Sequence, residues 1–237
     1  MALPKIAVPK FKIELPSTKK EVYFRPFLVK EEKTLLMALE GKDENEITEA
    51  VINIIDSCLD YDGDVRELPF FDIEYIFTQL RARSINNIID LNLRHASNSE
   101  CVHITKYSLN LEDVKVEFPE DFTDNVKITD DVGLKMKYPS IKTVNSVNEN
   151  LRSSKIDNVF YSIAANVDCI YDQDNVYDEF TQEEIVEWLG QLNKEQFFKV
   201  VSFFEKMPTV SCDIKYTCEE CGKEEFIPMR GLQSFFI

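Results

Sequence analysis

A chain of 237 residues with 44% hydrophobic and 11% aromatic side chains can bury a core without disulfide bonds. Acidic side chains outnumber basic ones by 43 to 27, and the formal charge of -16 repels phosphate backbones and anionic membranes, so no nucleic-acid partner is expected. The first ten residues contain two prolines and two lysines, and no later stretch approaches ~18 uninterrupted apolar residues, so we expect no signal peptide, no membrane span and a cytoplasmic protein.

The N-terminal third predicts a hairpin followed by three helices. Its first residues alternate apolar and polar side chains around a turn, and apolar side chains then recur at helical spacing. Pro69 suits the first position of the third helix, because its missing amide proton is not needed there. The expected elements are strands over residues 11–15 and 21–25 and helices over residues 29–40, 44–59 and 69–83.

The middle of the chain predicts antiparallel strands. Residues 88–93 and 104–111 follow a period of two on either side of a polar turn, which indicates a second hairpin. Residues 112–140 are rich in turns and short apolar runs, so strands or irregular connections are expected there.

The last third predicts mainly helices. Residues 144–170 carry an interrupted helical pattern, and Thr181 with Glu184 forms the Thr-x-x-Glu signature of a capping box at the start of the next helix. Asn193 can cap a last helix that Pro208 ends. The expected elements are helices over residues 183–189 and 194–206, and extended runs over residues 210–218 and 224–229.

These elements predict an α+β fold in which helices pack with short antiparallel β-hairpins. Two of the hairpins, the second and the last, carry cysteine and histidine side chains near their turns. We expect either an N-terminal region of residues 1–140 and a C-terminal region of residues 141–237, or one continuous domain.

The most specific chemical motif is the Cys-x-x-Cys-Gly turn that begins at Cys218. Such a turn can point two sulfur atoms at one ion, and the glycine relieves strain where the turn tightens. A tetrahedral zinc site needs four nitrogen or sulfur ligands, so a second pair must come from elsewhere. It could include Cys212, or consist of Cys101 and His103 if the two hairpins pack together; His95 also lies near the turn of the earlier hairpin. The candidate metal ligands are therefore Cys101, His103, Cys212, Cys218 and Cys221.

Two other interpretations of the cysteines stay open. The turn can simply close a hairpin whose thiols are reduced, and a structural zinc ion is the only cofactor that the sequence suggests. A thioredoxin-like redox pair is disfavoured, because that motif opens a helix and because Glu219 and Glu220 should raise the pKa of the thiols. Cys58 and Cys169 lie within helical patterns and are interpreted as small core residues.

No catalytic motif marks the chain as an enzyme. G-x-S-x-G, G-x-x-x-x-G-K-[ST], G-x-G-x-x-G and H-E-x-x-H are all missing from the sequence, and six glycines leave little room for phosphate-binding loops. Phenylalanines in residues 196–204 and in the apolar tail are candidates either for the core or for docking a protein partner. In the tail, the candidate partner-binding residues are Leu232, Phe235 and Phe236.

Four segments together resemble the baseplate hub family of T4-type contractile-tailed bacteriophages, which includes the hub assembly protein. They are residues 11–40, FDIEYIFTQLRARS from Phe71, VGLKMKYP from Val132 and GLQSFF from Gly231. The resemblance covers nearly the whole chain, with the segments in the same order.

The resemblance implies a viral protein, made in the host cytoplasm, that helps to build the central hub of the tail baseplate without catalytic turnover. Its implied partners are other hub proteins and the tape measure protein. Two alternatives stay open: a permanent baseplate subunit of the virion, held in a multimer through large apolar interfaces, and a small binding module stabilised by zinc. The acidic surface favours an assembly factor over a permanent subunit without deciding between them.

Overall fold

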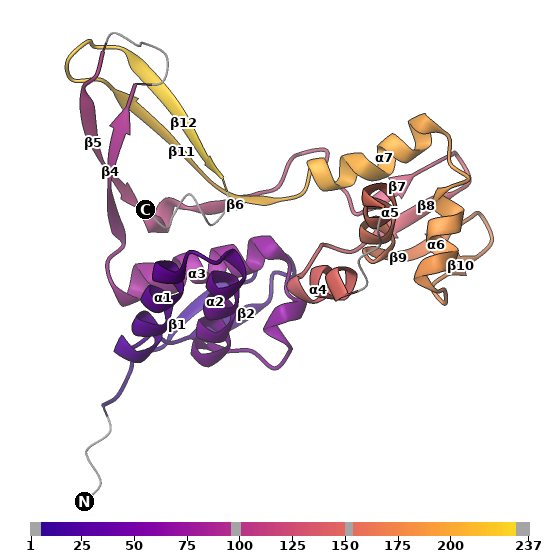
Figure 1. Ribbon diagram of the computed structural model, residues 1–237, viewed down its shortest axis with the longest axis horizontal. Helices are drawn as coiled ribbons and strands as arrows, with labels where there is room; N and C mark the ends of the chain where they lie inside the picture. The colour runs from indigo at the N-terminus through magenta and orange to yellow at the C-terminus, as the bar shows by residue number, and fades with distance from the viewer. Residues whose placement is uncertain (1–5, 96–100, 150–153, 231–237) are drawn as a thin grey trace, which may run out of the picture. The chain divides into compact units, whose positions relative to one another are not determined.

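The chain forms two compact units made of helices and small antiparallel sheets (Figure 1). The computed structural model describes residues 6–95, 101–149 and 154–230. Unit 1 comprises Met1–Val65, Phe71–Glu117 and Thr209–Ile237, and unit 2 comprises Arg66–Phe70 and Phe118–Pro208. This mixture of helices and antiparallel hairpins confirms the predicted α+β class.

The N-terminal part of unit 1 has the predicted hairpin and three helices. The hairpin gains a short third strand, so that the sheet order is β1-β2-β3. The third helix begins one residue later than expected, because Pro69 instead forms a bridge with Ser140. The elements are β1 (Phe11–Glu14), β2 (Glu21–Phe24), α1 (Val29–Gly41), α2 (Glu44–Cys58), β3 (Leu59–Asp60), the 3-10 turn η1 (Val65–Glu67) and α3 (Phe70–Ser84). Within this stretch, Arg66–Phe70 belong to unit 2.

Hydrophobic burial and helix capping account for these elements. Large apolar side chains are almost fully buried, among them Leu15, Phe24, Ile52, Ile55 and Ile76. Asp43 caps α2: its carboxylate accepts hydrogen bonds from the backbone amides of Asn45 and Glu46. The predicted core cysteine of α2, Cys58, is also buried.

The second part of unit 1 consists of two long hairpins. The first pairs β4 (Ile88–Arg94) with β5 (Ile104–Asn110), from Ile88 opposite Asn110 to Arg94 opposite Ile104. The second pairs β11 (Thr209–Thr217) with β12 (Glu224–Arg230), and β6 (Lys115–Glu117) adds to β11. A 3-10 turn, η2 (Leu111–Asp113), leads from β5 towards β6.

The two hairpins share one hydrophobic core, which brings segments far apart in sequence together. In Figure 1 β4–β5 and β11–β12 lie side by side, and the end of β4 and the start of β5 lie near the turn between β11 and β12. The hydroxyl of Tyr216 on β11 donates a hydrogen bond to the carbonyl oxygen of Arg94 at the end of β4, over 3.2 Å. The buried core residues are Ala82, Ile89, Leu91, Leu109, Leu111, Val114, Val210, Ile214, Tyr216 and Met229.

Unit 2 packs helices on a four-stranded antiparallel sheet of order β10-β9-β8-β7. Side chains from the sheet and from α5, α6 and α7 form a single core, which includes Leu134, Ile163, Leu189, Val200 and Phe203. The elements are β7 (Asn125–Lys127), β8 (Gly133–Met136), α4 (Ile141–Glu149), α5 (Lys155–Ala164), β9 (Val167–Tyr171), β10 (Val176–Tyr177), α6 (Gln182–Leu189) and α7 (Lys194–Glu205).

One strand of unit 2 lies where the sequence predicted a helix. The helical pattern of residues 144–170 ends at Ala164, and the next residues form β9, so Cys169 is a half-buried strand residue. Val167 and Ile170 are three residues apart, which imitates helical spacing. Both are buried in the same core because the register shifts by one residue where β9 passes Lys135 and Met136 of β8.

Both predicted helix caps of unit 2 are confirmed. Thr181 accepts a hydrogen bond from the Glu184 amide, and the Glu184 carboxylate accepts one from the Thr181 amide. Asn193 and Gln196 make the same reciprocal pair at the start of α7.

The boundaries of the two compact units differ from those of the two regions that we expected from the sequence, 1–140 and 141–237. Unit 2 contains residues from both regions, and unit 1 takes its last hairpin from the C-terminal region. Among the described residues, every helix is too short or too polar to cross a membrane.

Candidate metal centre

The Cys-x-x-Cys-Gly segment forms the tight turn between β11 and β12. The amide of Gly222 donates to the carbonyl oxygen of Cys218, and the amide of Cys218 donates to that of Lys223, both over 2.9 Å. Gly222 has φ of 71°, in the left-handed region that only glycine adopts without strain, as the sequence predicted. The turn holds Cys218 buried and Cys221 exposed.

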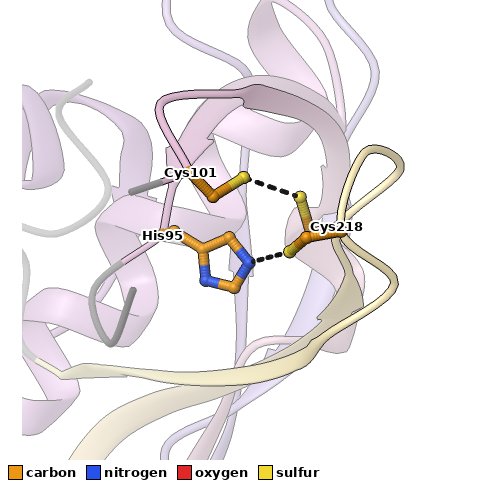
Figure 2. A group of neighbouring side chains, drawn as sticks. His95, Cys101 and Cys218 are labelled. Carbon is orange, nitrogen blue, oxygen red and sulfur yellow. Dashed lines mark hydrogen bonds between the residues drawn. The ribbon is translucent and has the colours of Figure 1, made fainter. Parts of the chain in front are cut away.

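Two side chains of the other hairpin meet this turn. His95 follows β4 and Cys101 precedes β5; Figure 2 shows Cys101 directed towards Cys218 and the ring of His95 directed towards the same turn. The ligand atoms of His95, Cys101, Cys218 and Cys221 all lie within 4.8 Å of one another. The sulfur atoms of Cys101 and Cys218 are 3.7 Å apart, and Nε2 of His95 is 2.8 Å from the sulfur of Cys221. We call these four residues the Cys3His cluster.

A carboxylate fixes the orientation of the histidine. Nδ1 of His95 lies 2.5 Å from Oε1 of Glu225, the second residue of β12. The imidazole is 1% exposed and the carboxylate 10%, so both groups are largely removed from water. A proton on Nδ1, shared with this carboxylate, leaves the lone pair of Nε2 directed at the cysteines.

The local hydrogen bonds favour the thiolate form at one cysteine. The backbone amide of Cys221 does most to lower the pKa of the Cys218 thiol, to about 6; burial opposes this, and the amide of Glu220 and the thiols of Cys221 and Cys101 reinforce it. The expectation that Glu219 and Glu220 raise the pKa is therefore wrong for Cys218, because hydrogen bonds from the backbone amides of the turn lower it. For Cys101, the His103 amide lowers the pKa, but burial and the thiols of Cys218 and Cys221 outweigh it and raise the pKa.

The structure thus brings together three of the five predicted ligands and adds His95. Cys212 lies six residues before Cys218 along β11, which is about 20 Å in a strand, and packs beside the hairpin core. Burial raises the pKa of its thiol. His103 lies outside the cluster: its ring nitrogens face Glu220 at 3.4 Å and Glu219 at 3.8 Å.

The predicted aromatic surfaces divide between core and solvent. On α7, Val200 and Phe203 are buried, whereas Phe198 is 61% exposed. The tail residues Leu232, Phe235 and Phe236 lie outside the described residues. The sequence did not single out a groove of about 440 Å³ in unit 2, which Phe180, Ile185 and Trp188 line with Asp172 and Glu184.

Comparison with known protein families shows which family the chain belongs to. It is an α+β protein in which, among the described residues, four side chains of the types that bind metal ions gather in unit 1. A family model described as "T4 bacteriophage base plate protein" matches residues 8–237, so the chain belongs to this family and is a bacteriophage baseplate protein of the viral tail. The match confirms the predicted resemblance to T4-type baseplate proteins. No curated protein and no solved structure matches the chain.

Proposed function

We propose that this chain is a non-catalytic assembly protein of the central baseplate hub, made in the host cytoplasm and acting through contacts with other hub proteins and the tape measure protein. The observation that carries the proposal is the family match, which extends over nearly the whole chain. The narrower assignment to the hub comes from the four sequence segments that resemble the hub family.

The surface of the protein supports a role in protein contacts. Large apolar side chains are exposed on separate elements of both units: Leu36 and Met37 on α1, Ile156 and Val159 on α5, and Phe198 on α7. Single exposed apolar residues are common in soluble proteins, whereas neighbouring exposed apolar side chains that form a patch mark interaction sites. The net charge of -16 keeps such a chain soluble and favours basic partners.

The apolar tail is the proposed docking segment, with Leu232, Phe235 and Phe236 as its anchors. Buried aromatic and aliphatic anchors supply most of the binding energy in protein interfaces. Removing residues 232–237 should therefore reduce hub complex formation without unfolding the chain. The matched control is Gln233→Ala with Ser234→Ala, which changes the same segment but keeps its apolar side chains.

Assembly in infected cells tests the proposal. Phage that lacks this chain should yield few complete hubs, and supplying the wild-type chain or the Gln233→Ala/Ser234→Ala control should restore the yield. The variant without residues 232–237 should restore it poorly while remaining as stable as wild type in thermal melts. Hubs that form at normal yield without the chain would disprove the proposal, and full rescue by the truncated chain would exclude tail docking alone.

The second candidate, a permanent structural subunit, is favoured by the same family match, because members are described as baseplate proteins. Quantitative mass spectrometry of assembly intermediates and of purified particles separates the two roles. An assembly factor is present in the intermediates and missing from the particles, whereas a permanent subunit is present in both in a fixed ratio.

A further inference from the structure

We propose that His95, Cys101, Cys218 and Cys221 bind one structural zinc ion that joins hairpin β4–β5 to hairpin β11–β12. The proposal is independent of the hub assignment, because it depends only on the geometry within unit 1. It assigns His95 as the fourth ligand and Glu225 as the residue that orients it.

The donor set suits zinc. Three thiolates and one imidazole form one of the common ligand sets of structural zinc sites. Four protein ligands fill the tetrahedron and leave no position for water or substrate, so the ion would stabilise the fold and would not catalyse a reaction. Carboxylate oxygens, which calcium and magnesium prefer, are not among the four grouped atoms.

The distances are close to those that a tetrahedral ion requires. Zn–S bonds of about 2.3 Å place two sulfur atoms about 3.8 Å apart, and those of Cys101 and Cys218 are 3.7 Å apart. A Zn–N bond of about 2.0 Å places nitrogen about 3.5 Å from sulfur. Nε2 of His95 is 2.8 Å from the sulfur of Cys221, so this pair must separate by about 0.7 Å, which a small rotation of the exposed Cys221 side chain achieves.

Glu225 gives the site the outer contact that metal-binding histidines generally have. Its carboxylate accepts from Nδ1 of His95, which fixes the tautomer in which Nε2 is free to bind a metal. At 1% exposure of the side chain, Nε2 has little access to water, so a metal ion bonded to it would satisfy the second ring nitrogen as the carboxylate satisfies the first. The other histidine of the chain, His103, is half-buried, and the two carboxylates near it are exposed. It therefore lacks the buried carboxylate partner that His95 has.

A disulfide explains less of the geometry than a metal ion does. A disulfide would use two of the three sulfur atoms and would give no role to His95. The four groups instead converge from two hairpins that are more than a hundred residues apart in sequence, so an ion among them would close a long loop. Such a cross-link restricts the unfolded chain and stabilises the contact between the hairpins.

Metal analysis of the full-length chain tests the site directly. The protein is purified without chelator from cells grown with added zinc, and its metals are measured by elemental mass spectrometry. We expect about one equivalent of zinc per chain, and less than about one-tenth of an equivalent in His95→Gln and in Cys221→Ser. The matched variants His103→Gln and Cys212→Ser should keep the full equivalent, because neither residue belongs to the cluster.

A second measurement avoids variants that fail to fold. Cobalt(II) added to wild-type chain from which metal has been removed should produce thiolate-to-cobalt charge transfer and the intense visible bands of a tetrahedral site. Zinc should then displace the cobalt. Glu225→Gln should keep the spectrum but weaken zinc affinity about 10- to 100-fold in competition with a chelator.

Three results of the metal analysis would overturn the proposal: less than about one-tenth of an equivalent of zinc in the wild-type chain, iron in place of zinc, or equal zinc loss in the His95→Gln and His103→Gln variants. An octahedral cobalt spectrum would also overturn it, because the four ligands would then not enclose the ion.

Discussion

The ion pair between Arg25 and Glu31 connects three elements of unit 1 through one nearly buried carboxylate. Oε1 of Glu31 accepts from the Arg25 guanidinium over 3.0 Å, and Oε2 accepts from the Leu28 amide over 2.7 Å at the start of α1. The same guanidinium donates to the carbonyl oxygen of Ser57 in α2. Burial raises the pKa of Glu31, but the hydrogen bonds from Arg25, Leu28 and Lys30 outweigh it, and the net pKa is lowered.

Replacing this carboxylate should make stability less dependent on pH. Glu31→Gln should lower the free energy of unfolding by about 1–2 kcal/mol at pH 7, because Arg25 loses its charged partner. The wild-type advantage should be complete above the pKa of an unfolded glutamate, about 4.3, and should disappear as pH falls through the lowered pKa of the folded state. Urea unfolding of both proteins from pH 7 down to about pH 2, below the lowered pKa of Glu31, measures the difference.

The control for this substitution is Glu40→Gln, at an exposed position near the end of α1. It should change the free energy of unfolding by less than about 0.5 kcal/mol at any pH in the range. A Glu31→Gln deficit that stays constant down to the lowest pH, or that the control shares, would show that the carboxylate charge of Glu31 is not the cause.

The sequence pointed to the three cysteines of the Cys3His cluster, together with Cys212 outside it, but not to the histidine that lies with them. The Cys-x-x-Cys-Gly spacing predicted the turn, and the left-handed φ of Gly222 agrees with it. The strand register that pairs Arg94 with Ile104, carried one residue further, would set His95 opposite His103. Periodicity cannot separate two residues at the same level of a hairpin. The discriminating feature is Glu225, whose position beside His95 depends on the packing of the second hairpin.

At the scale of elements, short sequence motifs predicted where helices begin, but they predicted less well which segments form strands and pair in sheets. Caps at Thr181 and Asn193 depend on hydrogen bonds within four residues, so the sequence contains all of their information. Strand β9 depends on its partner β8 and on the register shift at Lys135 and Met136, and its apolar spacing resembles that of a helix. Residues 167–171 therefore form a strand because of contacts with residues distant in sequence, which the local apolar pattern does not reveal.

The capping box of α6 offers a test at this scale. Thr181→Ala removes the hydroxyl that accepts from the Glu184 amide and should lower the free energy of unfolding by about 1 kcal/mol. Thr181→Ser keeps the hydroxyl and should cost only a few tenths of a kcal/mol. Chemical denaturation of the full chain, monitored by the fluorescence of Trp188 in α6, reports on the element concerned. Equal losses in the two variants would show that the hydroxyl does not cap the helix.

At the scale of the whole molecule, unit 2 is inserted into unit 1 within a pair of strands. Most of unit 2, Phe118–Pro208, begins directly after Glu117 of β6 and ends directly before Thr209 of β11, and these two strand residues are register partners. The entry and exit of the insertion are therefore adjacent, as in tolerated domain insertions. This arrangement accounts for the difference from the linear division that we expected near residue 140, since a linear reading cannot show that the chain returns to its first unit.

Separate hydrophobic cores predict separate thermal transitions for the two units. Val200 is fully buried in the core of unit 2, and Ile214 is fully buried in the hairpin core of unit 1. Val200→Ala and Ile214→Ala should each cost about 1–4 kcal/mol and should each lower the melting temperature of a different calorimetric transition. Scanning calorimetry of the full chain measures both transitions, with Phe198→Ala, an exposed position on α7, as the control that should move neither. A single transition that both core variants lower equally would mean that the two cores unfold as one cooperative structure, in spite of their separate packing.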